Sequence, residues 1–173
     1  MGRKPSKDNE NVYLKARLNM EGDWSREKAS QKLEWISADK LDRIENDRCF
    51  PTPEEVVQLA KIYKNPELCN YFCSHQCRIG QDYVPEIKIK DLSQIVLEMV
   101  NSLSSVEKMK DRLVEITVDG KIGEKECRDF VAIQDSLETM SMTVEALQLW
   151  AEQMVATGKI DKKTIDLYKK SDK

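Results

Sequence analysis

A sustained spacing of apolar residues in the C-terminal half constrains the fold more than any other feature of this 173-residue chain. From Phe130 onward, apolar residues recur at alternating intervals of three and four, and a similar run from Leu92 is interrupted once, at Lys110. The recurring positions are Val96, Met99, Leu103, Val106 and Leu113 in one run, and Ile133, Leu137, Met140, Val144, Leu147, Ala151 and Met154 in the other. An average repeat of 3.5 residues keeps one apolar seam in line along a helix. The sequence therefore predicts an antiparallel, coiled-coil-like helical hairpin within residues 91–173, followed by a short C-terminal helix.

The rest of the chain is also helical in pattern, which predicts an all-α protein. Alternation typical of a strand is nearly absent, with Val84 to Ile89 as the best candidate, and only six Gly and five Pro interrupt the chain. Ser25, Ser37 and Thr52-Pro53 are strong helix-start signals, because a hydroxyl accepts from free amides of the first turn and proline fits the first helical position. Further helices are expected over Asn11 to Met20 and from Glu67.

The net charge of the chain shows that it is not a strongly basic protein. Lys and Arg number 28 against 31 Asp and Glu, for a net charge of −3, so any nucleic-acid contact must be a local patch. No apolar run approaches the length of a membrane span, and the start of the chain has no apolar segment typical of a secretion signal. We therefore expect a cytoplasmic protein without membrane contact. The five cysteines are then expected to be reduced thiols or metal ligands rather than a disulfide framework.

The stretch from Ser25 to Asn46, with the Pro51-Thr52-Pro53-Glu54 segment that follows, resembles the Cro/C1 (XRE) type of helix-turn-helix regulator. The similarity covers about residues 11–65. Its strongest part is Leu41-x-x-Ile44-Glu45-Asn46 leading into the helix start at Pro51-x-Pro53. Two features depart from the family pattern: the spacing from Ala29 to Glu45 is one residue longer, and the turn reads Glu34-Trp35-Ile36 where glycine is usual.

The resemblance implies a transcriptional regulator that binds double-stranded DNA with its third helix in the major groove. It places Ala38, Asp39 and Arg43 at base contacts, with Arg26 beside them. Their chemistry suits this role, because arginine pairs with guanine, aspartate accepts from cytosine, and alanine can touch the thymine methyl group. Lys40, Asn46 and Arg48 are expected to contact phosphates.

The many acids near the expected third helix weaken this interpretation. Residues 38–48 carry three basic and four acidic side chains, so we expect modest and salt-dependent affinity. An alternative is a protein-interaction adaptor whose helix-turn-helix no longer reads DNA. Exposure of Trp35 would favour the adaptor, since tryptophan is a common anchor in protein interfaces.

Three cysteines and the single histidine lie close together in the sequence, at Cys69, Cys73, His75 and Cys77. They suggest a zinc or iron–sulfur site and, with it, a metal- or redox-responsive regulator. On one continuous helix Cys69 and Cys77 would lie about 12 Å apart, too far to share an ion, so such a site requires a helix break near Ser74. The other interpretation is that the thiols are small buried apolar groups.

The sequence gives no support for an enzyme. It has one histidine, no glycine-rich phosphate loop and no nucleophile motif. The hairpin seam leaves Leu149, Trp150 and Val155 uncovered, so either the N-terminal domain or a second copy must pack there, and we favour a homodimer. The predicted organisation is a flexible basic arm (1–10), a helix-turn-helix domain (11–65), a Cys-rich helix and connector (66–90), and a dimerising hairpin (91–173).

Overall fold

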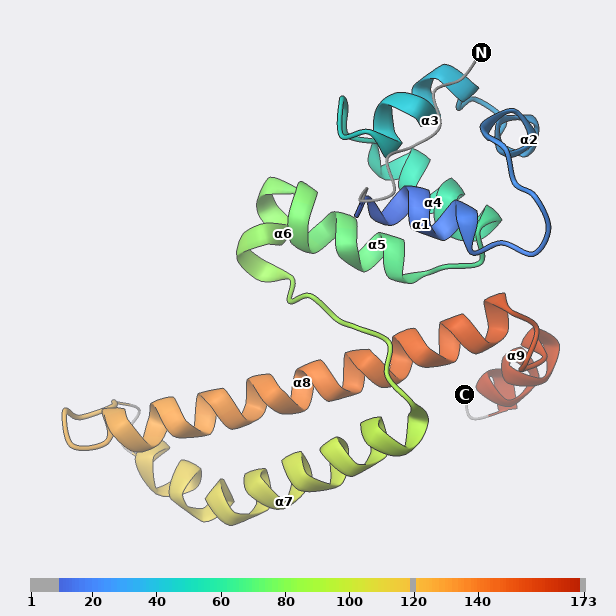
Figure 1. Ribbon diagram of the computed structural model, residues 1–173. Coiled ribbons are helices and arrows are strands. Elements are labelled where there is room, and N and C mark those ends of the chain that lie inside the picture. The colour runs from blue at the N-terminus through green and yellow to red at the C-terminus, as the bar shows by residue number, and fades with distance from the viewer. Residues whose placement is uncertain (1–9, 119–120, 172–173) are drawn as a thin grey trace. The chain divides into compact units, whose positions relative to one another are not determined.

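The computed structural model describes residues 10–118 and 121–171, with the side chains of 168–171 left out (Figure 1). The expected basic arm therefore lies, except for Glu10, outside the described residues. The helices are α1 (Val12–Leu18), α2 (Arg26–Lys32), α3 (Ala38–Glu45), α4 (Pro53–Ile62), α5 (Glu67–Tyr71), the π-helical η1 (Phe72–Gln76), α6 (Arg78–Tyr83), α7 (Leu92–Thr117), α8 (Cys127–Ala156) and α9 (Lys162–Ser171). The described ranges contain no strand, Val84 to Ile89 included, which confirms the all-α prediction. No helix in these ranges has the length and apolar character needed to cross a membrane.

The helix starts predicted from the sequence are found in the structure. The Ser25 hydroxyl accepts from the amide of Lys28, and the Ser37 hydroxyl accepts from the amide of Lys40. Thr52 forms a reciprocal capping box, in which its hydroxyl accepts from the Glu55 amide while the Glu55 carboxylate accepts from the Thr52 amide. These local bonds fix where α2, α3 and α4 begin.

The chain divides into two compact units, one formed by residues 1–86 and 152–173 and the other by residues 87–151. The division differs from the expected boundaries, because the end of α8 and α9 belong with the first unit. Helices α1 to α5 enclose an apolar core in this first unit. Its fully buried side chains are Tyr13, Ala16, Ala29, Leu33, Ile36, Leu41, Ile44, Val56, Leu59, Ala60, Tyr63 and Leu68.

Helix α7 and the part of α8 up to Ala151 belong to the second unit and run beside one another in opposite directions (Figure 1). Contacts between them include the ion pair of Arg112 with Asp129, with 2.7 Å between Nε and Oδ2, and a 3.5 Å contact from the Ser136 hydroxyl to the Met109 sulfur. The buried positions of α7 are Ile95, Ser102 and Ile116, whereas the predicted seam residues Val96 and Leu103 are almost half exposed. The seam predicted for α7 is therefore wrong at alternate positions.

The predicted seam of α8 needs a similar correction. Ile133 is buried as expected, but Leu137 and Val144 are exposed, and Thr143 and Ala146 are buried in their place. Both helices carry apolar side chains on two adjacent faces. The face that is buried in the structure is not the one with the longest uninterrupted repeat of apolar residues.

The cover over Leu149 also differs from the expectation. Leu149 and Ala146 pack with Ile87 and Ile95, and Trp150 adds to this cluster. Ile87 belongs to the connector that precedes α7. A segment of the same chain therefore covers Leu149, so no second copy is needed to bury this residue.

Candidate nucleic-acid interface

The segment between α2 and α3 is held by two apolar side chains. Leu33 is 3% exposed and Ile36 is 1% exposed, and both join the core of the first unit. Glu34 and Trp35 between them point to solvent, with 60% of Trp35 exposed. These two anchors hold the turn in place of the glycine usual in the family that the sequence resembles.

Helix α3 has an inward face and an outward face. Leu41 and Ile44 are buried in the core, together with the carboxylate of Glu45. Asp39 and Arg43, one helical turn apart, are both exposed, and Ala38 is partly exposed at the start of the helix. The side chains expected to reach bases therefore lie on the accessible side of a helix whose other side is fixed in the core.

A buried ion-pair network ties α3 to α1 and α2. The guanidinium of Arg17 in α1 donates two hydrogen bonds to the Glu45 carboxylate. The distances are 2.6 Å from Nε to Oε1 and 2.7 Å from Nη2 to Oε2. Arg26 of α2 donates from Nε to Oε2 of the same carboxylate at 2.7 Å. Burial lowers the pKa of Arg17, but the hydrogen bonds and charge of Glu45 raise it more, so the net shift is upward. Glu45 therefore serves to orient three helices rather than to face a ligand.

Arg26, expected beside the base contacts, lies between α2 and α3. Its Nη1 lies 2.9 Å from Oδ1 of Asp42, and only 12% of its side chain is exposed. Because its guanidinium is committed to Asp42 and Glu45, Arg26 acts as a positioning residue between α2 and α3 in this structure.

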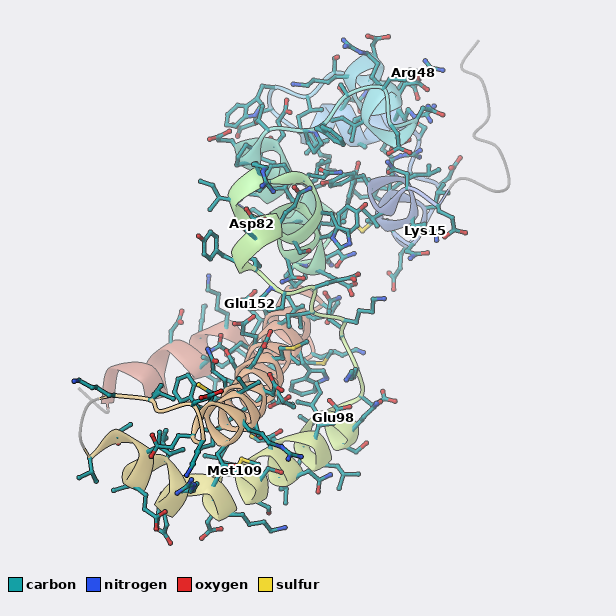
Figure 2. The ribbon with its side chains drawn as sticks, turned by 90° about the vertical axis from the view of Figure 1, so that its left-hand side faces the viewer. Lys15, Arg48, Asp82, Glu98, Met109 and Glu152 are labelled. Atoms are coloured by element: carbon teal, nitrogen blue, oxygen red, sulfur yellow. The ribbon has the colours of Figure 1, made fainter. Side chains whose placement is uncertain are left out.

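The residues expected at phosphates lie at the surface but are partly engaged. Arg48, shown at the surface in Figure 2, is 58% exposed and approaches Asp42 at 3.3 Å. Asn46 donates to the backbone oxygen of Asp42 at 2.7 Å and to its carboxylate at 3.1 Å. Lys40 pairs with Glu55 of α4 and keeps 37% of its side chain exposed.

Most acids of the α3 region are thus paired with other side chains of the same chain. Glu45 is bound by Arg17 and Arg26, Asp42 by Arg26 and Arg48, and Asp47 accepts from Asn11 at 2.8 Å. Counting residues 38–48 alone overstated the local negative charge, because Arg17 and Arg26 come from elsewhere in the chain. Asp39 remains as the exposed acid on the outward face.

The importance of Arg17 was missed in the sequence. It follows Tyr13 and Leu14 at helical spacing, so it falls on the buried side of α1. A cation on an apolar helix face signals a buried acidic partner, but the sequence alone does not identify Glu45, which lies 28 residues away.

The cysteine segment contains a helix irregularity near the predicted break. Helix α5 widens into the π-helical η1, and the amide of Cys77 donates to the oxygen of Phe72, five residues back, at 2.9 Å. After η1, the chain continues into α6, which contains Gly80. His75 stacks on Tyr71 at 4.4 Å between ring centroids and lies 3.8 Å from the Glu86 carboxylate.

The predicted metal site is not assembled in this structure. Cys69, Cys73 and Cys77 are partly buried free thiols. Within the described part of the chain, no three side chains among His, Cys, Asp and Glu come together to hold an ion. Burial raises the pKa of the Cys69 thiol, and the nearby Cys73 adds to the increase.

Comparisons with protein-family models, with curated proteins and with solved structures find no match for this chain.

Proposed function

We propose that the chain is a sequence-specific, double-stranded-DNA-binding regulator of the Cro/C1 helix-turn-helix type. Helices α2 and α3 serve as the helix-turn-helix, and α3 enters the major groove. The observation that carries the proposal is the division of α3: Asp39 and Arg43 are exposed on one side, while Leu41, Ile44 and Glu45 fix the other side in the core. A recognition helix needs this combination of a rigid base and an accessible edge.

The chemistry of the outward face fits base readout better than general attraction to DNA. Arg43 can donate two hydrogen bonds to guanine, and Asp39 can accept from the cytosine amino group. Arg48 adds a cation at the end of α3 for a phosphate. The α7–α8 pair acts as an antiparallel hairpin that joins two copies, so that two α3 helices meet two half-sites.

The test is binding to DNA sequences selected from a random duplex library by the full chain, followed by fluorescence anisotropy over a series of salt concentrations. We expect enrichment of a motif and a measurable loss of affinity as the salt concentration rises. Arg43→Ala should weaken binding by about 10- to 100-fold, the value of one bidentate contact with guanine. The matched control is Arg78→Ala, which removes an exposed arginine of α6 and should leave affinity unchanged.

Failure to enrich any motif, or equal affinity of the Arg43→Ala variant and the unmodified chain, would reject the proposal. Asp39→Asn gives a second readout, because it should change the preferred base at one position of the motif more than it changes the salt dependence.

The exposure of Trp35 favours the second candidate, a protein-interaction adaptor. Its indole lies in the turn directly before α3, and a large exposed aromatic group is typical of an interface anchor. In an adaptor, Trp35→Ala abolishes capture of the partner while Arg43→Ala has no effect, which is the reverse of the pattern expected for a DNA-binding regulator.

A further inference from the structure

Helix α7 presents a second stripe of exposed side chains beside the face that packs on α8. We define the outer stripe of α7 as Val100, Leu103, Glu107, Lys110, Val114 and Val118. Its four apolar members are strongly exposed, at 53% for Val100, 47% for Leu103, 61% for Val114 and 81% for Val118, and both charged members are exposed. Intervals of three and four keep these residues in line along the helix.

The outer stripe flanks the surface that packs on α8, and Lys110 lies at its edge, where it lines a hollow with Ile133 and Leu137 of α8. Val100 and Val114 precede the buried Ser102 and Ile116 by two residues, which places them roughly 160° away around the helix. Helix α8 and the Ile87 segment, which form the core of this unit, therefore leave the outer stripe uncovered.

The order of residues in the outer stripe is self-complementary in the antiparallel direction. When two helices pack antiparallel, the numbers of facing residues have a nearly constant sum. With a two-fold axis midway between Glu107 and Lys110, each Glu107 faces Lys110 of the second copy and each Leu103 faces Val114. Val100 then faces Val118. Charge meets opposite charge and apolar meets apolar along the whole stripe.

In a parallel arrangement the stripe would bring like charges together, since Glu107 would face Glu107 and Lys110 would face Lys110. Like charges in an interface are unfavourable, so the pattern selects the antiparallel arrangement. An interface with a two-fold axis brings the same patch of both copies together, and the sequence of this stripe satisfies that condition.

We propose that two copies of this chain associate through their outer stripes, with α7 packed antiparallel on α7 of the second copy. The inference rests on the homodimer of the proposed function and assigns its interface to α7, in place of the region around Leu149 that the sequence suggested. Two Glu107–Lys110 pairs set the register, and Leu103, Val114 and their apolar neighbours supply the contact area.

Charge reversal in the full chain tests the interface, with sedimentation velocity over a range of concentrations as the measurement. The unmodified chain should sediment as a dimer. Lys110→Glu and Glu107→Lys should each raise the dissociation constant of the dimer at least about tenfold, because each creates two like-charge contacts. The double variant with both reversals restores the pairs and should dimerise like the unmodified chain.

Mixing the two single variants gives the most selective readout. The two positive side chains of the Glu107→Lys variant match the two negative side chains of the Lys110→Glu variant, so the mixture should form a heterodimer more tightly than either variant forms a homodimer. Lys108→Glu is the matched control, since it makes the same charge change on an exposed part of α7 outside the outer stripe. It should leave the dimer intact, and circular dichroism should show equal helix content in every variant.

A monomer at all concentrations, or a dimer that both single reversals leave unchanged, would overturn the inference. DNA binding by the unmodified chain is measured separately by anisotropy. A chain that selects a DNA motif but shows no response to the reversals would retain the proposed function and lose this interface, whereas a reversible α7 dimer without DNA binding would retain the interface and lose the function.

Discussion

Glu45 is the residue on which the geometry of the candidate interface depends most. Its carboxylate has no exposed surface and receives three hydrogen bonds from Arg17 and Arg26. A buried ion-pair network of this kind contributes little net stability compared with an apolar core, but breaking it is costly because it leaves buried charges without partners. The network therefore fixes the angle between α2 and α3 more than it raises overall stability.

Glu45→Gln should lower the free energy of unfolding by about 3–5 kcal/mol, since the buried guanidinium of Arg17 loses its counter-charge and that of Arg26 keeps only Asp42. Urea denaturation followed by circular dichroism measures the change. The control is Glu34→Gln, the same chemical change at an exposed position of the turn, where surface substitutions alter stability by no more than about 0.5 kcal/mol. Equal effects of the two substitutions would show that the network is unimportant.

Cys69 should be a slow nucleophile in the folded protein. Burial and the neighbouring Cys73 raise the pKa of its thiol, and the thiolate is the reactive form. We expect iodoacetamide to modify the exposed Cys127 first, and the rate at Cys69 to keep increasing at pH values where an ordinary thiol has reached its plateau. Mass spectrometry of the labelled peptides measures both rates. In denaturant the difference should disappear, and its persistence there would contradict the explanation.

At the scale of elements, the junction of η1 and α6 depends on a single glycine. A Cβ added at Gly80 would lie 1.9 Å from the backbone oxygen of Cys73 and 2.6 Å from its carbonyl carbon. Backbone atoms cannot move aside as a flexible side chain can. Glycine is therefore required by close packing between α6 and η1, not by a left-handed backbone conformation.

Gly80→Ala should destabilise the first unit by about 1–3 kcal/mol or more, the usual cost of overpacking, because α6 must separate from η1. Thermal unfolding measures the loss. Gly123→Ala serves as the control, since its added methyl group meets only the end of the Glu126 side chain at 3.2 Å. A similar small change for both substitutions would indicate that α6 shifts at little cost.

The long helices show how an apolar repeat can be compatible with more than one face. Met99, Val106 and Leu113 belong to the predicted seam and are partly buried in the structure. Their alternating partners are Ile95, Ser102 and Ile116 instead of Val96 and Leu103. A shift of one residue at alternate positions preserves half of the seam, so the helix spacing alone cannot select between the two faces.

At the scale of the whole molecule, a net charge of −3 limits how DNA can be bound. Only part of the positive charge near α3 is available to attract DNA, because Arg26 and Lys40 are paired with acidic side chains of the same chain. Arg43 and Arg48 remain as exposed cations of the α3 region. Affinity must then come mainly from specific contacts, with a smaller share from the release of counterions than in strongly basic DNA-binding proteins.

The salt dependence of binding should therefore be shallow. Each neutralised phosphate contributes about −0.9 to the slope of log affinity against log salt concentration, so the phosphate contact of Arg48 in each copy of a dimer gives about −2. Arg48→Ala should reduce the steepness by about 2 units in a dimer by the same relation, with little change in the preferred sequence. A slope twice as steep would show that further cations reach the DNA.

The sequence alone determined the helical class and the positions where α2, α3 and α4 begin. A cap is satisfied by groups three residues away, as when Ser37 accepts from Lys40 or Thr52 exchanges bonds with Glu55, so these features are encoded locally. Leu41 and Ile44, three residues apart, lie on the buried face of α3. The exposure of Asp39 and Arg43 is the complement of that burial.

The tertiary structure decided which distant groups meet. The pairing of Glu45 with Arg17 and Arg26, the cover that Ile87 provides for Leu149, and the face of α7 that packs on α8 all depend on contacts between segments far apart in the chain. From the sequence alone, each of these residues could have packed against several others. Its charge or apolar character determines the kind of partner but not where in the chain that partner lies. Only the packing of the whole unit selects one of them, since a buried group must be satisfied by what lies beside it in space.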